Sequence, residues 1–401
     1  MKKELFQINV SLNKGSTGRI AEQIGLLAKS NGFDVYYAHG ARYIGKSVHH
    51  TIKLGNRWNE YIHAGIFGKF LGFDGGGAIC STESLVNIID SIQPDIIHLH
   101  NIHGYYLNFR ILFEYLNKKQ IPIIWTLHDC WPFTGGCTFL NHSQCKKWKI
   151  KCEKCPLRKF IDNSIQIYSL KKRLFSNYPN LTLIPVSNWL EELVHESFMK
   201  DVPTHVIHNG TDLDIFKPID KCTELINQYS LTGKRIIIGV AAPWSARKGL
   251  NDFLQISANL SDEYIIVLIG LNEKQIAKLP PNIIGIKRTE NTYQLAKWYS
   301  LADVFVNPTY SDNFPTTNIE ALACGTPVIT YRTGGSPEAI DDKTGIVVER
   351  GDIKMLQEAI ETICTSNIDY SVNCRQRAEK YFNKDDRFRE YIDLFNQLLR
   401  Q

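Results

Sequence analysis

The 401-residue sequence lacks any apolar run that approaches the roughly 18 residues needed to cross a membrane. Its first segment, MKKELFQINVSLNKG, has only a short apolar stretch that Glu4, Gln7 and Asn9 interrupt, so the core of a signal peptide is missing too. The net charge of +5 is small for this length and does not predict nucleic-acid binding. We therefore expect a cytoplasmic protein without a nucleic-acid partner.

Composition places the chain among soluble globular proteins, because 43 % of its residues are hydrophobic and 22 % are charged. A single core stops growing at about 250 to 300 residues, so a chain of 401 residues should form two domains. Short apolar runs alternate with amphipathic helical segments along most of the chain. This rhythm predicts two α/β domains, each with a doubly wound parallel sheet.

The order of the apolar runs and helical segments predicts where the domains begin and end. We predict an N-terminal domain over residues 1–208, a linker over 209–220, a C-terminal domain over 221–382, and a helix over 383–401 that packs back on the N-terminal domain. A ligand is expected at the carboxyl ends of the strands, where the two domains face each other. The expected strands are 5–10, 34–38, 95–100, 122–127, 181–186 and 204–208, then 234–241, 263–270, 282–287, 303–308, 326–330 and 344–349.

A glycine turn follows the first strand. In NKGSTGRI, Gly15 and Gly18 open a helix, and the amides of such a turn can approach an anion, although the dinucleotide pattern G-x-G-x-x-G is absent. A plain tight turn explains the same residues equally well.

Histidines gather at two later strand ends. In HLHNIHG, alternation places His98 and His100 on one face of a strand, where they either hydrogen-bond the core or a polar ligand or, less readily, bind a metal. His128 and Asp129 follow the strand PIIWTL directly, so His128 either donates to a sugar or phosphate oxygen or caps the loop.

Five of the ten cysteines lie in an irregular segment that begins at Cys130, residues 130–156, which we call the Cys-rich loop. Cys137, Cys145, Cys152 and Cys155 end in a C-x-x-C pair and have the composition of a closed structural zinc site. Free thiols or a disulfide remain open. The basic residues and Trp148 in and after this loop suit an anionic membrane surface, single-stranded nucleic acid, or simple solvation.

Charged residues also follow strands in the second half. Arg247 and Lys248 precede a helix and would suit a diphosphate. Asp312 and Glu320 are separated by seven residues in SDNFPTTNIEALACG, with Asp312 in a loop and Glu320 in the first turn of the next helix.

In order, these segments resemble the retaining glycosyltransferases of family four, also called glycosyl transferases group one, which have the GT-B fold of two Rossmann-like domains. The resemblance is carried by VSNWL and, through the second half of the chain, by HNGTDLDIFKP, RKGL, ADVFVNPTYSDNFPTTNIEALACGTPVI and TGGSPEAI. The first half matches at the glycine turn, DIIHLHN and TLHD, and the block over 303–338 is the most specific.

The resemblance implies roles for individual residues. Glu320 would hold the ribose hydroxyls of a nucleotide, and Asp312 would approach the donor sugar. His128 would bind that sugar without acting as a nucleophile. The implied sets are catalytic His128, Arg247, Lys248, Asp312 and Glu320; donor-binding Gly15, Ser16, Gly18, Asn313, Phe314, Pro315, Thr316 and Thr317; and acceptor-binding His100, Asn101, His103 and Asp129.

The sequence departs from the family pattern twice. An Arg is usual five residues before the conserved Lys, but Pro243 stands there, and we hypothesise that Arg247 supplies the missing charge. Asp312 replaces the usual Glu and reaches less far into the sugar.

The activity implied is transfer of a hexose, with retention and without a metal cofactor, from a UDP- or GDP-sugar to a saccharide or lipid-linked acceptor. Capsule, O-antigen or exopolysaccharide assembly at the inner face of the plasma membrane is the family expectation. The alternatives are a nucleotide-sugar epimerase on this fold, a glycoside hydrolase, and a non-catalytic zinc-loop protein.

Overall fold

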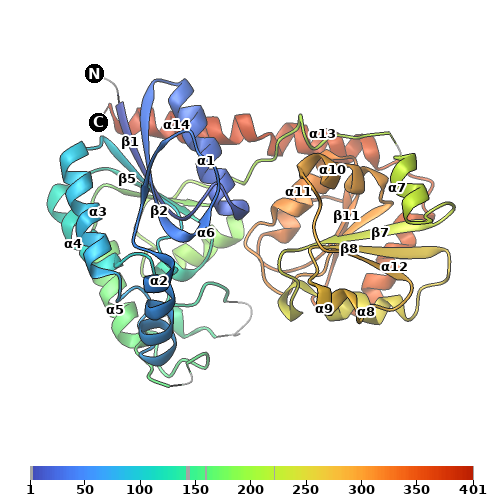
Figure 1. Ribbon diagram of the computed structural model, residues 1–401, viewed down its shortest axis with the longest axis horizontal. Coiled ribbons are helices and arrows are strands. Elements are labelled where there is room, and N and C mark those ends of the chain that lie inside the picture. Colours follow the sequence, from blue (N-terminus) through green and yellow to red (C-terminus); the bar gives the residue numbers. More distant parts are fainter. Residues whose placement is uncertain (1–2, 141–144, 159, 221, 401) are drawn as a thin grey trace. The chain divides into compact units, whose positions relative to one another are not determined.

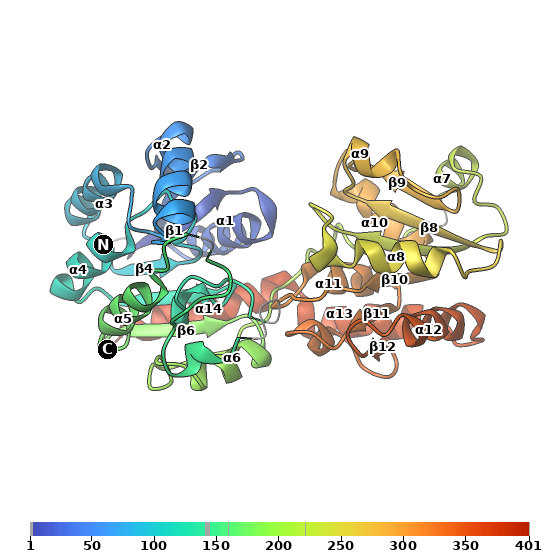
Figure 2. The same ribbon diagram turned by 90° about the horizontal axis from the view of Figure 1, so that it is seen from below.

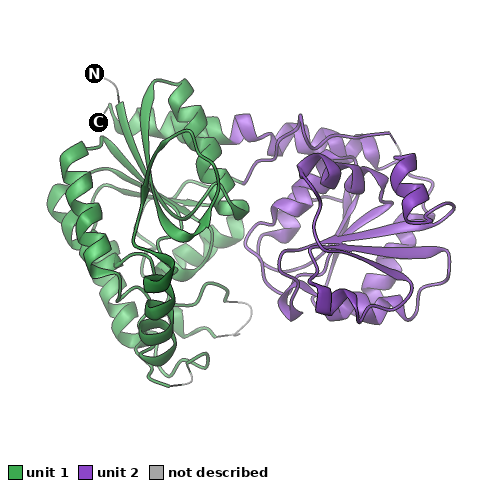
Figure 3. Cartoon of the chain, in the orientation of Figure 1, with its two compact units in different colours: residues 1–208, 388–401 green, residues 209–387 purple. Residues whose placement is uncertain are grey.

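The computed structural model describes residues 3–140, 145–158, 160–220 and 222–400. They form two compact units (Figures 1 and 3): the first contains Met1–His208 and Phe388–Gln401, and the second contains Asn209–Arg387. The segment 209–220, expected as a linker, is thus part of the second unit, and the C-terminal helix is divided between the units at residue 387.

The first unit is built on six parallel strands in the order β3-β2-β1-β4-β5-β6. The inner strands are apolar and buried on both faces, as expected where helices cover both sides. The strands are β1 (Lys3–Leu12), β2 (Phe33–Ile44), β3 (His50–Lys53), β4 (Ile96–Leu99), β5 (Ile123–Leu127) and β6 (Leu181–Pro185). The helices are α1 (Gly15–Ser30), α2 (Arg57–His63), the π-helix η1 (Ala64–Phe70), α3 (Ile79–Ile92), α4 (Phe109–Lys119), the 3-10 turns η2 (Trp131–Phe133) and η3 (Lys147–Lys149), α5 (Ser164–Phe175) and α6 (Asn188–His195).

Two different cores cover the faces of this sheet. On one face, α1 and the C-terminal helix α14 (Lys384–Leu398) pack on the strands, and Phe388, Tyr391 and Phe395 of α14 are buried with Leu5 of β1. On the other face, α3, α4 and α5 lie side by side (Figures 1 and 2). Aromatic rings from α4, β5 and α5 pack against one another there, and Trp125 and Phe175 meet edge to face. The last helix of the chain therefore completes the core of the first unit.

The second unit repeats the plan with six parallel strands in the order β12-β11-β10-β7-β8-β9. Helices α8 and α12 contribute Phe253 and Ile360 to the core on one face, while α11 packs between α10 and α13 on the other. The strands are β7 (Arg235–Val240), β8 (Tyr264–Ile269), β9 (Ile283–Ile286), β10 (Val304–Asn307), β11 (Val328–Tyr331) and β12 (Gly345–Val348). The helices are α7 (Thr223–Gln228), the 3-10 turn η4 (Ala246–Lys248), α8 (Leu250–Ser257), α9 (Glu273–Ile276), α10 (Thr292–Leu301), α11 (Thr316–Ala323), the 3-10 turn η5 (Ser336–Ala339), α12 (Ile353–Thr365) and α13 (Ser371–Phe382).

The predicted fold class, two parallel α/β domains, is confirmed, but one expected strand is wrong. Residues 204–208 form only an isolated bridge between Leu183 and Thr204. The Leu183 carbonyl accepts the His205 amide and the Pro185 carbonyl accepts the Ile207 amide, but Pro185 has no N–H to donate in return, so the ladder is incomplete. The edge strand β3 was not predicted, because HTIK is short and mostly polar. No helix in the described part of the chain is long and apolar enough to cross a bilayer.

Candidate active site

In the second unit, the predicted cations and the predicted acidic residue meet in one place. Lys248 ends the 3-10 turn after β7, and Asp312 lies in the loop after β10, so both stand at carboxyl ends of adjacent strands. The Lys248 Nζ lies 2.5 Å from Asp312 Oδ2, and both side chains are about one-fifth exposed (20 % and 19 %). The other Asp312 oxygen accepts the Asn313 amide at 3.0 Å. The result is a preformed, solvent-accessible ion pair.

Arg247 ties the same two loops together. Its guanidinium donates to the Ser311 carbonyl at 2.6 Å, and its own carbonyl accepts the Tyr310 amide at 2.8 Å. Gly249 follows with φ of +75°, and a Cβ there would lie 2.2 Å from the Pro308 carbonyl oxygen. Glycine is therefore required next to Lys248 so that the start of α8 can approach the β10 loop this closely.

Glu320 lies deeper in its helix than expected. The sequence pattern predicts it in the first turn, but α11 begins at Thr316, so Glu320 is the fifth residue and belongs to the second turn. Its Oε2 accepts a hydrogen bond from the Tyr299 hydroxyl of α10 at 3.3 Å. Tyr299 was not predicted as part of this site, because nothing in its local sequence distinguishes it from a core tyrosine.

The predicted donor-binding segment is the loop and first turn before Glu320. Pro315 occupies the N-cap of α11, and its side chain cannot accept a hydrogen bond. The N-cap side chain therefore leaves the first amides of the helix, beginning with those of Thr316 and Thr317, uncapped. The Asn313 carbonyl accepts the Gly335 amide at 3.0 Å, which joins this loop to the TGGSPEAI segment. Phe314 is buried.

In the first unit, the glycine turn begins a helix as predicted. Gly15 is the first residue of α1 and has φ of +72°, and Ser16 follows it in the first turn. A Cβ on Gly18 would lie 2.7 Å from Ser11 Oγ, so a larger side chain would displace the end of β1. The N-cap residue, Lys14, makes no side-chain cap, and the first turn contains no acidic residue, which leaves a positive helix end.

The histidines of β4 and β5 form a buried group. His98 Nε2 and Thr126 Oγ1 are 2.8 Å apart, and His100 Nδ1 lies 3.1 Å from His128 Nε2. The His98 and His100 ring centroids are 4.1 Å apart, so both rings share one face of β4, as alternation predicted. No set of three or more His, Cys, Asp or Glu side chains among the described residues has metal-binding geometry as it stands.

Burial keeps these imidazoles neutral. Desolvation lowers the pKa of His98 to about 3 and that of His128 to about 4, and it lowers the pKa of His100 well below its ordinary value. At neutral pH each ring therefore offers one donor and one acceptor nitrogen rather than a positive charge.

Asp129 carries the negative charge of this region. Burial raises the pKa of its carboxyl, but the charge and hydrogen bond of His103 and the Trp131 amide outweigh burial and lower the pKa overall. The His103 Nε2 to Asp129 Oδ2 distance is 2.7 Å, and the Trp131 amide donates to Oδ1 at 2.9 Å. Asn101 is fixed by its backbone, since its carbonyl accepts the Val10 amide at 3.0 Å.

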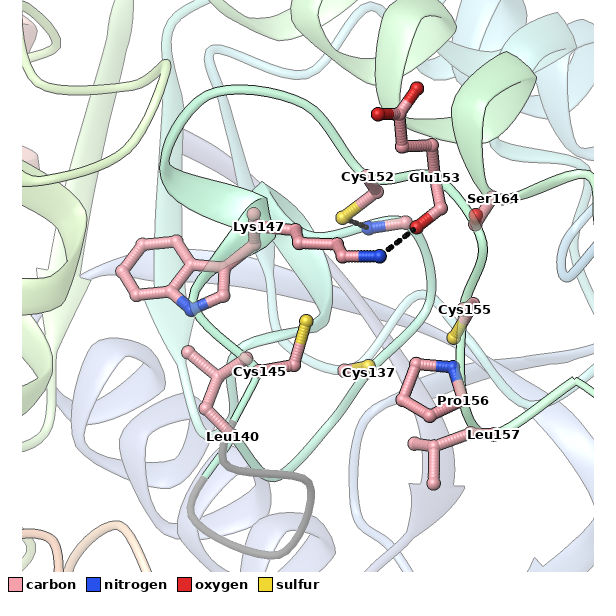
Figure 4. Close-up of a pocket in the computed structure, with 12 residues that line it drawn as sticks. Cys137, Leu140, Cys145, Lys147, Cys152, Glu153, Cys155, Pro156, Leu157 and Ser164 are labelled. Atoms are coloured by element: carbon pink, nitrogen blue, oxygen red, sulfur yellow. Dashed lines mark hydrogen bonds between the residues drawn. The ribbon is translucent and has the colours of Figure 1, made fainter.

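The Cys-rich loop brings its four predicted ligands to one pocket (Figure 4). Cys137, Cys145, Cys152 and Cys155 line it together with Trp148 and Leu140. Beside the loop, the ammonium of Lys171 is fully buried, donates to the Trp131 carbonyl at 2.6 Å, and lies 3.3 Å from the centre of the Trp131 ring. Lys171 was not predicted, because in SLKKRLF it reads as one of three solvent-facing cations.

Comparisons with known proteins agree with this architecture. The model of Glycosyltransferase Family 4 matches residues 60–215, and that of Glycosyl transferases group 1 matches residues 223–381. The putative colanic acid biosynthesis glycosyl transferase WcaC of Escherichia coli (strain K12) is 24 % identical over 426 residues, which cover 98 % of this chain and 100 % of that protein.

Solved structures share the whole fold. Sucrose-phosphate synthase from Thermosynechococcus elongatus aligns with a TM-score of 0.75 at 19 % identity, over 99 % of each chain. The structure of Anabaena HepE in complex with UDP aligns with a TM-score of 0.69 at 13 % identity, over 98 % of this chain and 100 % of that one.

The two parallel-sheet units and these neighbours define the fold, the two-domain GT-B fold. The two family models match adjacent parts of the chain, and on these matches the chain belongs to the glycosyl transferases, with a second unit of the group 1 type and a first unit of the family 4 type. The roles of its individual residues stay predictions.

Proposed function

We propose that this glycosyltransferase moves a hexose from a UDP- or GDP-sugar to a saccharide or lipid-linked acceptor in the assembly of a cell-surface polysaccharide. The observation that carries the proposal is the Lys248–Asp312 ion pair at 2.5 Å, with Arg247 bonded to the same loop. The similarity to a colanic acid glycosyl transferase supports the pathway, and the UDP complex of a structural neighbour supports the donor class.

The ion pair suits a diphosphate leaving group. When the sugar–oxygen bond breaks, negative charge develops on the departing diphosphate and must be stabilised. Lys248 supplies a positive charge that is held in place by Asp312. The neighbouring Arg247 supplies a second positive charge and is bonded to the Ser311 carbonyl of the same loop. Two cations can perform this stabilisation without a metal, and we propose metal-independent catalysis on that ground.

Retention of the anomeric configuration is part of the same proposal. A double displacement needs a carboxylate free to attack the sugar, whereas Asp312 is already bound by the Lys248 ammonium and the Asn313 amide. We therefore favour reaction on the front face of the sugar, in which the departing phosphate accepts the proton of the acceptor hydroxyl.

Different residues would contact the donor and the acceptor. Glu320, held by Tyr299, would accept hydrogen bonds from the ribose hydroxyls, and the amides at the start of α11 would approach the donor. The neutral His100 and the ionised Asp129 would hydrogen-bond a hydroxyl-rich acceptor, and His128 would contact the donor sugar.

Thermal unfolding with nucleotides tests this function directly. The midpoint should rise with UDP or GDP and less with ADP or CMP, because a ligand that binds only the folded state stabilises it. Lys354→Ala, an exposed lysine of α12, should show the same shift as the wild type, and Lys248→Ala a smaller one. A chain that responds to none of the four nucleotides contradicts the proposal.

We further propose that the first unit contacts the cytoplasmic face of the membrane. Trp58, Ile62, Ile66 and Phe70 recur every four residues along α2 and η1, and each is at least half exposed (78 %, 52 %, 50 % and 55 %). The Phe70 and Phe160 rings are 6.1 Å apart, which extends the patch onto the segment after the Cys-rich loop. Exposed cations lie next to Trp58 and Phe70 in the sequence, at Arg57 and Lys69, and before Phe160, at Lys151 and Lys154.

Apolar side chains flanked by cations suit an anionic lipid surface. We expect co-sedimentation with vesicles that contain phosphatidylglycerol and much less with phosphatidylcholine alone. The double variant Trp58→Ser with Phe160→Ser should lose binding, while Ile368→Ser, an exposed residue of the second unit, should retain it. Equal sedimentation of both variants with the anionic vesicles would contradict membrane contact by this patch.

A further inference from the structure

The four thiols of the Cys-rich loop have no part in the proposed transfer. Cys137, Cys145, Cys152 and Cys155 come from separate turns of the loop, yet Figure 4 shows their sulfur atoms around one space. That space has a volume of about 20 Å³, which holds one atom-sized occupant and neither a sugar nor a nucleotide.

We propose that these four cysteines bind one structural zinc ion. Zinc in structural sites is held by four tetrahedral ligands, and four thiolates are among its commonest sets. On binding, each thiol releases its proton to solvent, and the four Zn–S bonds form without any change of oxidation state. At about 2.3 Å per Zn–S bond, neighbouring sulfurs stand about 3.8 Å apart, so the sulfurs must draw together by rotation about the Cα–Cβ bonds.

Hydrogen bonds to sulfur already prepare the ligands. The Gly135 amide donates to Cys152 Sγ at 3.2 Å, and the Leu157 amide donates to the Cys155 sulfur two residues before it. The Cys137 and Cys155 thiols are hydrogen-bonded to each other. Amide donors aimed at sulfur orient a metal-bound thiolate and reduce its charge, whereas a buried free thiol is only a weak acceptor.

A buried lysine beside the loop suits a tetrathiolate site. Zinc with four thiolates carries a net charge of −2. The Lys171 side chain has no exposed surface, and its Nζ donates to the Trp131 and Thr134 carbonyls at 2.6 and 3.0 Å. Burial lowers the pKa of Lys171 well below its ordinary value, while the nearby Asp74 and Asp129 carboxyls and the Cys152 and Cys137 sulfurs oppose that shift. Thiolates bound to zinc would add to this negative charge.

The zinc would fix a loop that adjoins Asp129. The Thr134 hydroxyl donates to the Cys137 carbonyl at 2.8 Å, and Lys171 joins Thr134 to Trp131. The Trp131 ring lies 5.5 Å from that of His103, the partner of Asp129. Metal binding thus orders one wall of the predicted acceptor region, while all ligands come from the loop itself.

Metal analysis of the purified full chain, prepared without chelator, tests the site. We expect about one zinc per chain in the wild type and in Cys80→Ser, whose cysteine is exposed on α3. Cys152→Ser and Cys155→Ser should each reduce the zinc content to background. A wild-type content near zero, or cysteine variants that keep their zinc, would overturn the proposal.

A second measurement needs no variant that could fail to fold. A mercurial thiol reagent is added to the wild-type chain with a zinc-sensitive dye, and zinc release should follow modification of the four loop thiols. Peptide mapping without reductant should find all four as thiols. A disulfide among them, or four thiols that react without releasing zinc, rejects the site.

Discussion

Lys248 and Asp312 of the second unit form a partly exposed ion pair, whereas His98, His100 and His128 of the first unit are buried and neutral. Lys248 and Asp312 are each about one-fifth exposed at 2.5 Å, while His98 has no exposed surface and a pKa lowered to about 3 by burial. A diphosphate needs fixed charge, and a hydroxyl-rich acceptor needs hydrogen-bond donors and acceptors. Under the proposed function, the second unit would therefore serve the donor diphosphate and the first unit the acceptor.

The largest expected effect is at Lys248. Lys248→Ala removes the charge that would stabilise the departing diphosphate, and we expect kcat to fall about 10²- to 10³-fold, the usual loss for a transition-state stabiliser. The measurement is nucleoside diphosphate release from the sugar nucleotide that best stabilises the chain. Lys354→Ala is the matched control, since its side chain is 87 % exposed. Unchanged turnover in Lys248→Ala would show that Lys248 does not stabilise the departing diphosphate.

The buried, neutral His98 of the first unit predicts that the stability of the chain depends on pH. The folded-state pKa of His98 is about 3 and the unfolded chain has the ordinary value of about 6.5, so between these values only the unfolded state binds the proton. The free energy of unfolding should therefore decrease as the pH falls from 7 to 5, by about 2 kcal/mol from His98 alone.

Urea unfolding at both pH values measures this slope. His98→Gln should flatten it, even if the variant is less stable at pH 7, and His50→Gln, an exposed histidine of β3, should leave it unchanged. Equal slopes for His98→Gln and the wild type would show that His98 is not kept neutral by the fold.

A smaller effect should separate Arg247 from Lys248. Arg247→Ala removes a second cation and the bond to the Ser311 carbonyl, and we expect about a tenfold loss of kcat, or about 1.4 kcal/mol. Arg332→Ala, an exposed arginine paired with Glu349, is the control. If Arg247→Ala leaves turnover intact while Lys248→Ala abolishes it, Arg247 does not replace the family arginine missing at Pro243.

The smallest expected effect concerns Tyr299, a positioning residue. Tyr299→Phe keeps the buried ring but removes the 3.3 Å hydrogen bond to Glu320, which is worth about 0.5 to 1.5 kcal/mol. The Kd for the nucleotide and the KM for the donor should rise about two- to tenfold with kcat unchanged. Tyr293→Phe, half exposed on α10, is the control. A fall in kcat without a change in KM would assign Tyr299 a different role.

The strands and the placement of the charged loops follow from local sequence. Continuous apolar runs mark β5, β7 and β10, and the polar residues after them lie at strand ends because parallel strands share an edge. Thus Lys248 and Asp312 could be expected near each other, although their direct contact depends on the packing of Gly249 against Pro308.

Other features depend on tertiary contacts that local patterns do not encode. Lys171 sits among three consecutive cations, and only the packing of α5 on the Cys-rich loop shows which one is buried. The segment 204–208 has strand composition, but its ladder is incomplete because Pro185 of β6 has no N–H to donate. Glu320 was placed one turn too early because the first helical residue depends on the proline N-cap.

The position of α14 has a consequence for synthesis on the ribosome. Its Phe388, Tyr391 and Phe395 fill the core around Leu5, which is translated long before them. Most of the first unit is thus translated before the second, but its core cannot close until α14 has left the exit tunnel. The second unit, whose residues are contiguous, can fold earlier. Termination before α14 would leave one face of the nascent N-terminal sheet covered by α1 without α14, a substrate for chaperones and proteases.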